Sequence, residues 1–246
     1  MIMGGIVGII SQADIVPRLV ESMGGIPYHA KDSCGIATLS SSTIDVRKDI
    51  GSLQEAAQQR GFNLAEGCLG IGHIGKLVEG SRISRKNAQP HLSCDGKFAV
   101  VNDGVISNSQ RLRANLETTG RHFFFSESSA EVFAHLMEEA YWVSHSGEEA
   151  FAQALQQIEG DFAIAVISNC ESPRIFCAHN KNSLWIGIAA QTTFASSSRE
   201  TFQFDPNPHR LEEGQYAILS EGGCSLAGTS HRDKEILDPN SLIHMR

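Results

Sequence analysis

The sequence has 246 residues and a mass of 26.7 kDa, with 41% hydrophobic and 20% charged residues, so it can bury one substantial core. This composition excludes a disordered chain, a collagen-like fibre and a coiled coil. The formal charge is −8, with 20 basic against 28 acidic residues and no run of Lys or Arg, so we expect neither nucleic acid nor a membrane surface as a partner.

Short apolar segments bounded by Gly, Asn, Asp or Ser predict strands, and periodic apolar positions predict helices between some of them. In chain order we expect a strand at 5–10, a helix at 16–23, strands at 35–39, 69–74 and 97–101, helices at 108–119, 129–141 and 151–158, and strands at 162–167, 174–178, 184–189 and 215–219.

The third of these helices has the clearest start signal. Ser128 and Glu131 have the spacing of a capping box, and apolar residues follow in two adjacent rows four residues apart. The helices cluster instead of following every strand, which disfavours a doubly wound parallel sheet. We therefore expect antiparallel or mixed sheets flanked by helices.

Residues 70–75 (GIGHIG) match the GxGxxG pattern of dinucleotide-binding loops. That pattern requires a helix that opens at the third glycine, and residues 76–81 show no helical periodicity. We interpret the glycines as part of a strand and expect no nicotinamide cofactor.

The cysteines and histidines give no metal-binding signature. Six scattered cysteines contain no CxxC pair, and ten histidines show neither HExxH nor zinc-finger spacing. Residues 1–10 lack a basic start, so we expect no signal peptide, and no apolar segment is long enough to cross a bilayer. We expect reduced thiols in a cytoplasmic protein, with no metal and no cofactor.

Five segments, in order, resemble the glutaminase domain of glutamine–fructose-6-phosphate aminotransferase, a class II amidotransferase with an N-terminal nucleophile. They are residues 3–8 (MGGIVG, similar to MCGIVG), 28–37 (YHAKDSCGIA, similar to YRGYDSAGIA), 72–91 (GHIGKLVEG and NAQPH, similar to GHTRWATHG and NAHPH), 101–108 (VNDGVISN, similar to VHNGIIEN) and 126–132 (SESSAEV, similar to SETDTEV).

The resemblance implies an α+β fold, the four-layer αββα sandwich of the Ntn-hydrolase type. It extends from residue 4 to about 228, so we expect one glutaminase-like domain at 1–228 and a polar tail or linker at 229–246. In the family, further domains bind and isomerise the sugar phosphate. We expect that this chain alone does not make glucosamine 6-phosphate.

The resemblance also implies where the chemistry should lie. The family hydrolyses glutamine with a cysteine thiol whose proton is taken by its own α-amine. That position is Gly4, which has no side chain, and a bulky Ile2 disfavours removal of the initiator Met. The oxyanion positions map to Asp103, where an ionised carboxylate replaces a donor, and to Gly104.

The positions that hold glutamine in the family have changed as well. The arginine that binds the α-carboxylate maps to Gly75, the following tryptophan to Lys76, and the acid that holds the α-amine to Ser129. Lys76, Glu79 and Asp103 are interpreted as solvated charges at an inactive cleft, with a new pocket for a polar ligand as the alternative.

Other candidate groups receive structural interpretations. Cys34 and Cys68 have no adjacent His or helix N-terminus to activate them, so we expect inert thiols. His91 and the loop 87–91 are expected to fix neighbouring strands, and Asp32-Ser33 to form a turn.

The sequence therefore predicts a pseudo-glutaminase with a regulatory or partner-binding role, beside a protein such as an isomerase or synthetase subunit. Two alternatives stay open. The first is an enzyme with residual or altered amidohydrolase activity, including the glutaminase subunit of a split aminotransferase. The second is a binding module for another small polar ligand. The sequence does not determine the oligomeric state.

Overall fold

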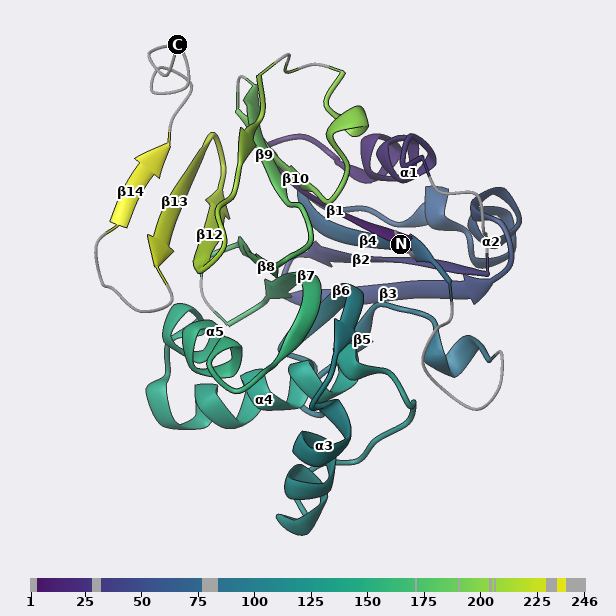
Figure 1. Ribbon diagram of the computed structural model, residues 1–246. Coiled ribbons are helices and arrows are strands. Elements are labelled where there is room, and N and C mark those ends of the chain that lie inside the picture. The colour runs from purple at the N-terminus through teal and green to yellow at the C-terminus, as the bar shows by residue number, and fades with distance from the viewer. Residues whose placement is uncertain are drawn as a thin grey trace.

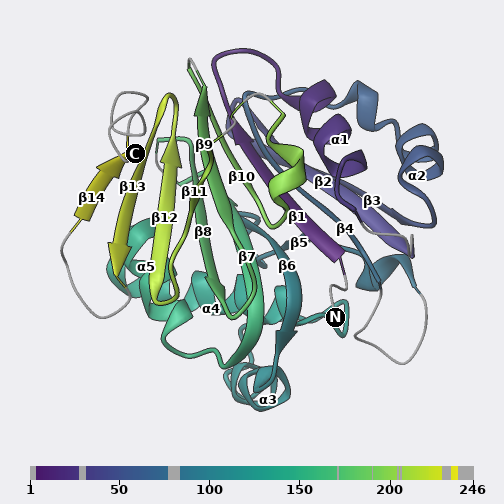
Figure 2. The ribbon, with the colours of Figure 1, turned by 45° about the horizontal axis from the view of Figure 1, so that its top comes forward.

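Two antiparallel sheets of seven strands each form the centre of the molecule (Figures 1 and 2). The computed structural model describes residues 4–27, 32–76, 84–170, 172–189, 191–203, 205, 207–228 and 234–237. The first sheet has the order β11 (His209–Arg210), β9 (Trp185–Ala189), β10 (Thr192–Ser196), β1 (Gly4–Ile10), β4 (Leu69–Gly75), β2 (Ser33–Ser40), β3 (Thr43–Ile50). The second has the order β14 (Lys234–Leu237), β13 (Gly223–Gly228), β12 (Gln215–Ser220), β8 (Arg174–Asn180), β7 (Gly160–Ser168), β6 (Phe98–Ile106), β5 (His91–Leu92).

Helices cover the outer face of each sheet. On one side of the molecule lie α1 (Val16–Gly24) and α2 (Leu53–Arg60), and on the other α3 (Ser109–Thr118), α4 (Ser129–Ser144) and α5 (Gly147–Leu155) (Figures 1 and 2). Short 3₁₀ turns occupy Phe62–Leu64, Arg85–Asn87 and Arg199–Thr201. None of the described helices is both long and apolar enough to cross a membrane.

Three apolar layers follow from the alternation of side chains along each strand. Along β1, Ile6 packs between the sheets and Val7 packs under α1 and α2. Along β6, Val101 packs between the sheets while Phe98 packs under α4 and α5. Consecutive apolar residues are thus buried on both faces, and the predicted four-layer αββα sandwich is confirmed.

The predicted strands and helices are all present, and residues 70–75 lie in β4 as expected. Several elements were not predicted, namely helix α2 and strands β3, β5, β10, β11, β13 and β14. Polar residues dominate β3, which is the edge strand of its sheet, and its exposed side chains conceal the apolar pattern.

The predicted capping box at Ser128 is wrong. Ser128 Oγ accepts a hydrogen bond from the Ala130 N–H at 3.3 Å, but the Glu131 carboxylate accepts from the N–H groups of Phe125 and Ser126, both at 2.8 Å. Glu131 therefore holds the preceding loop instead of the helix start. The reciprocal box occurs at Ser52 and Glu55, at the start of α2.

Part of the segment expected as a tail belongs to the sheet. Residues 234–237 form β14, which pairs antiparallel with β13 from Cys224↔Leu237 to Ala227↔Lys234. The domain boundary expected at residue 228 therefore falls between β13 and β14, which are paired strands of one sheet.

Candidate functional site

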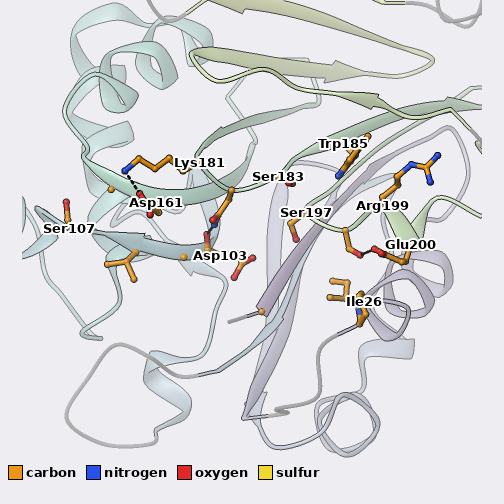
Figure 3. Close-up of a pocket in the computed structure, with 17 residues that line it drawn as sticks. Ile26, Asp103, Ser107, Asp161, Lys181, Ser183, Trp185, Ser197, Arg199 and Glu200 are labelled. Atoms are coloured by element: carbon orange, nitrogen blue, oxygen red, sulfur yellow. Dashed lines mark hydrogen bonds and ion pairs between the residues drawn. The ribbon is translucent and has the colours of Figure 1, made fainter. Parts of the chain in front are cut away.

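A cavity of about 1060 Å³ lies where β1 of the first sheet meets β6 of the second. Its wall includes Gly4 from β1, Asp103 and Gly104 from β6, and residues from the segments around β9 and β10. Figure 3 shows the ion pair of Lys181 and Asp161 on one side of Asp103, and Ser197, Arg199 and Glu200 on the other.

Gly4 lies against Asp103 and Gly75. Gly4 pairs with Gly75 in the β1–β4 ladder. A Cβ placed on Gly4 would lie 3.3 Å from Asp103 Oδ1, 2.9 Å from the Gly75 Cα and only 2.6 Å from the Ile74 carbonyl oxygen. Gly4, the expected nucleophile position, therefore faces Asp103, the expected oxyanion position, and a side chain fits at Gly4 only if the backbone shifts.

Asp103 brings a buried acidic group to this wall. The residue is 8% exposed, and burial raises the pKa of its carboxyl to about 6. The main-chain oxygen of Asp103 accepts a hydrogen bond from Asn182 Nδ2 at 2.9 Å, which fixes the strand beside the cavity. At neutral pH the side chain is mainly ionised, so it presents acceptors where amide hydrolysis needs a donor.

Gly104 keeps a backbone conformation that only glycine adopts easily. Its φ is +110°, and a Cβ there would lie 2.2 Å from the Asp161 carbonyl oxygen on the paired strand β7. Gly160 has the same constraint, with a Cβ 2.2 Å from the Val105 carbonyl oxygen. The close approach of β6 and β7 at this point thus depends on two glycines.

The former clamp positions are only partly gathered around the cavity. Gly75 adjoins Gly4, and Lys76 is exposed just beyond β4. Ser129 is 1% exposed, and its Oγ lies 3.3 Å from Asn102 Nδ2, so it contacts the residue next to Asp103. Ser129 is not among the described residues of the wall. Glu79 lies outside the described residues.

The cysteines lie away from the described part of this wall. None of the six cysteines, all of which the structure describes, is among the described residues that line the cavity. Cys34 is buried in β2, where burial raises its pKa to about 12. Cys68 is exposed, with its Sγ 3.6 Å from the Gln12 carbonyl oxygen.

The loop before β5 joins the two sheets, as its sequence indicated. The Gln89 amide bonds both main-chain groups of Asn102, at 2.6 Å and 2.9 Å. His91 is 5% exposed and lies 3.4 Å from both Ser126 Oγ and Lys48 Nζ through its Nδ1. Burial holds the pKa of His91 well below its ordinary value, which suits a neutral structural residue.

Sequence reasoning missed the polar wall opposite Asp103. Ser197 Oγ accepts a hydrogen bond from the Ile6 N–H at 2.9 Å, and the Arg199 guanidinium lies 5.9 Å from the Trp185 ring centre. Lys181 pairs with Asp161 at 3.0 Å. Ser197 and Arg199 follow β10, a strand that was not predicted, and the serines at 196–198 indicate only a loop.

The fold and the cavity between β1 and β6 define the class of protein, an amidotransferase sandwich of the Ntn type. A family described as "Glutamine amidotransferase domain" matches residues 80–203, about half of the chain. The chain belongs to this family, and the resemblance seen in the sequence is confirmed.

Several known relatives are glutamine–fructose-6-phosphate aminotransferases. The chain is 34% identical over 220 residues to that of Thermococcus kodakarensis, covering 89% of this chain and 36% of the relative. It is 32% identical over 234 residues to that of Brucella suis, covering 95% of this chain and 38% of the relative. The chain thus spans about a third of the length of these curated relatives and is similar to their glutaminase domain.

Solved structures agree on the fold. The allosteric regulatory enzyme of purine biosynthesis has a TM-score of 0.79 at 20% identity, over 93% of this chain and 49% of that one. Glutamine phosphoribosylpyrophosphate amidotransferase from B. subtilis has a TM-score of 0.76 at 20% identity, over 93% and 50%.

Proposed function

We propose that this chain is a pseudo-glutaminase that keeps the amidotransferase sandwich and has lost glutamine hydrolysis. The observation that carries the proposal is the proximity of Gly4 to Asp103. The position that should bear a thiol has no side chain, and the position that should donate to an oxyanion carries a buried acid.

The chemistry of amide hydrolysis explains why these changes act together. An acyl-enzyme requires a nucleophile, and glycine supplies none. Loss of one oxyanion donor alone typically lowers the rate about 100- to 1000-fold. An ionised Asp103 would add repulsion, and Gly75 leaves the substrate carboxylate without a bidentate cationic contact.

The surface of the domain then serves a partner or a regulatory role in the cytoplasm. The curated relatives carry "isomerizing" in their names, and this chain matches only about a third of their length. An isomerase or synthetase subunit is accordingly the partner we propose. In a complex with such a subunit, this domain would take the position that the glutaminase domain has in the longer relatives.

A second candidate is a binding module for a small polar ligand. The cavity of about 1060 Å³ presents Asp103 on one side and Ser197, Arg199 and Glu200 on another. Such a wall offers both donors and acceptors. A ligand selective for the folded state raises the melting temperature, so a thermal-shift screen of amino acids and sugar phosphates tests this candidate.

The decisive experiment for the main proposal uses the purified full chain with glutamine and with a diazo-ketone glutamine analogue. We expect ammonia release equal to that of buffer and no covalent mass gain. A bacterial glucosamine-6-phosphate synthase serves as the positive control. Turnover of glutamine above buffer, or an adduct on any cysteine, would establish the enzyme alternative instead.

A further inference from the structure

Four side chains with metal-binding atoms gather on the outer side of the second sheet, away from the cavity described above. Cys94 lies in the turn between β5 and β6, His122 in the segment between α3 and α4, and His135 and Glu138 one turn apart on α4. One ligand atom from each residue lies within 4.8 Å of the other three. None of the four is among the described residues that line the cavity at Gly4.

Three of the separations within the group are close to those around a tetrahedral ion, and all four ligand atoms lie within 4.8 Å of one another. His122 Nδ1 lies 3.2 Å and His135 Nδ1 lies 3.4 Å from the same oxygen, Glu138 Oε2. Cys94 Sγ lies 3.8 Å from His135 Nδ1. Around a tetrahedral zinc ion with bonds of about 2.0–2.3 Å, neighbouring ligand atoms lie about 3.3–3.6 Å apart.

The tautomer of His122 is set by its outer partner. His122 Nε2 lies 3.0 Å from Glu139 Oε1, which accepts, so a neutral His122 ring carries its proton on Nε2. His122 Nδ1 then carries a lone pair, is buried, and has no hydrogen-bond partner although Glu138 Oε2 is near. A buried lone pair and a carboxylate oxygen 3.2 Å apart repel each other unless a proton or a metal ion lies between them.

His122 and Glu138 make hydrogen bonds to neighbouring groups of the kind that hold metal ligands in place. A carboxylate that orients a ligating imidazole, as Glu139 orients His122, is the usual second layer of a zinc site. Glu138 is 1% exposed and accepts from the N–H groups of Asp95 at 2.8 Å and Cys94 at 3.1 Å. These bonds hold the carboxylate between the β5–β6 turn and α4.

We propose that Cys94, His122, His135 and Glu138 bind one zinc ion. A thiolate, two neutral imidazoles and a carboxylate form a ligand set suited to Zn²⁺, and their two negative charges balance the ion. Four protein ligands leave no open position, so the site is structural. It ties the β5–β6 turn and the segment before α4 to α4 itself.

Solvent reaches the proposed site from one side. Cys94 is exposed, and both Cys94 and His135 form part of the wall of a second cavity of about 420 Å³. Trp142 stacks on His122 with ring centres 5.5 Å apart, and Phe124 packs edge-on against His135 at 4.6 Å. The ion can thus enter beside the thiol while aromatic rings cover the imidazoles.

The test compares the full chain with two cysteine variants, Cys94→Ser and the matched control Cys68→Ser, since both residues are exposed. We expect one zinc per chain by elemental analysis in the wild type and in the control. Cobalt added to the metal-free protein should give a near-ultraviolet thiolate-to-metal band in both. Cys94→Ser should lose that band and bind zinc more than about 100-fold more weakly, beyond the typical effect of losing an outer partner.

Two further measurements keep the test decisive. Zinc should raise the melting temperature of the wild type and slow the alkylation of Cys94 but not of Cys68. Glu139→Gln, which keeps all four ligands, should weaken zinc binding about 10- to 100-fold. Absence of stoichiometric metal, or equal binding by Cys94→Ser and Cys68→Ser, would overturn the proposal.

Discussion

Gly4 and Asp103 belong to different sheets, yet a Cβ on Gly4 would lie 3.3 Å from Asp103 Oδ1. The two positions that we expect to correspond to the family's nucleophile and oxyanion amide therefore lie next to each other, and neither carries the expected residue. The cavity keeps its place in the fold because the β1–β4 and β6–β7 ladders that form it are intact. If glutamine hydrolysis has been lost, as we propose, the scaffold has persisted without that chemistry.

The first prediction concerns the space at Gly4. Gly4→Ala should destabilise the protein by about 1–3 kcal/mol, because its Cβ would lie 2.6 Å from a carbonyl oxygen of the neighbouring strand. Urea denaturation measures the effect. Gly24→Ala is the control, since the nearest atom to its Cβ would be 3.8 Å away, and it should be neutral or slightly stabilising. Equal stability of Gly4→Ala and wild type would show that the position still accepts a side chain.

The second prediction concerns the pH dependence caused by Asp103. Its folded-state pKa of about 6 exceeds the ordinary value of 3.8, so the folded protein holds this proton more tightly than the unfolded chain. The stabilising effect of the bound proton is full below pH 4 and disappears as the pH rises to about 6. At about 1.4 kcal/mol per pKa unit, the buried carboxylate costs on the order of 3 kcal/mol above pH 6.

Asp103→Asn removes this titration. The variant should therefore be more stable than the wild type at pH 7.5, and the difference should vanish near pH 4, as measured by chemical denaturation at both values. Asp161→Asn changes the net charge equally at an exposed carboxylate of the same cavity and serves as the control. A difference independent of pH would contradict the assignment.

Local sequence patterns predicted most of the fold because the central strands are apolar on consecutive residues and lie between two other layers. The pattern failed for β3, whose Asp45 and Arg47 bond each other at 2.8 Å on the sheet edge. It also placed the capping box at the wrong serine. Spacing alone did not reveal that Glu131 holds residues 125 and 126 while Glu55 completes the box of α2.

The cavity at Gly4 and the proposed zinc site could also be predicted only in part from the sequence. Gly4, Gly75 and Asp103 could be located from the sequence because family motifs surround them. Strand register pairs Gly4 with Gly75, and the packing of the two sheets brings Asp103 to Gly4. Ser197 and Arg199 reach the same cavity from the segment after β10, where no motif marks them. The proposed zinc ligands come from three separate segments, so neither HExxH nor CxxC spacing could indicate them.

The third prediction concerns the alternative nucleophiles. At a pKa of about 12, only about one Cys34 in ten thousand is a thiolate at pH 8, and the residue is fully buried. Iodoacetamide should modify exposed Cys68 at least about 1000-fold faster, as peptide mass spectrometry would show. In guanidinium the two rates should become equal. Rapid labelling of Cys34 in the folded protein would reopen it as a catalytic candidate.

The last prediction concerns Gly104, which sets the spacing of β6 and β7 beside the cavity. Gly104→Ala requires φ of +110° and places a Cβ 2.2 Å from the Asp161 carbonyl oxygen, so we expect a loss of about 3 kcal/mol or more. Gly120→Ala measures the stability lost when alanine takes a positive φ without a close contact, because Gly120 has φ of +67° and no atom lies within 4 Å of its Cβ. That variant should lose only about 1 kcal/mol. Denaturation of both variants under the same conditions measures the difference, which reports the close contact of the two strands. Equal losses would mean that β6 and β7 can separate there, and the cavity wall would then not depend on Gly104.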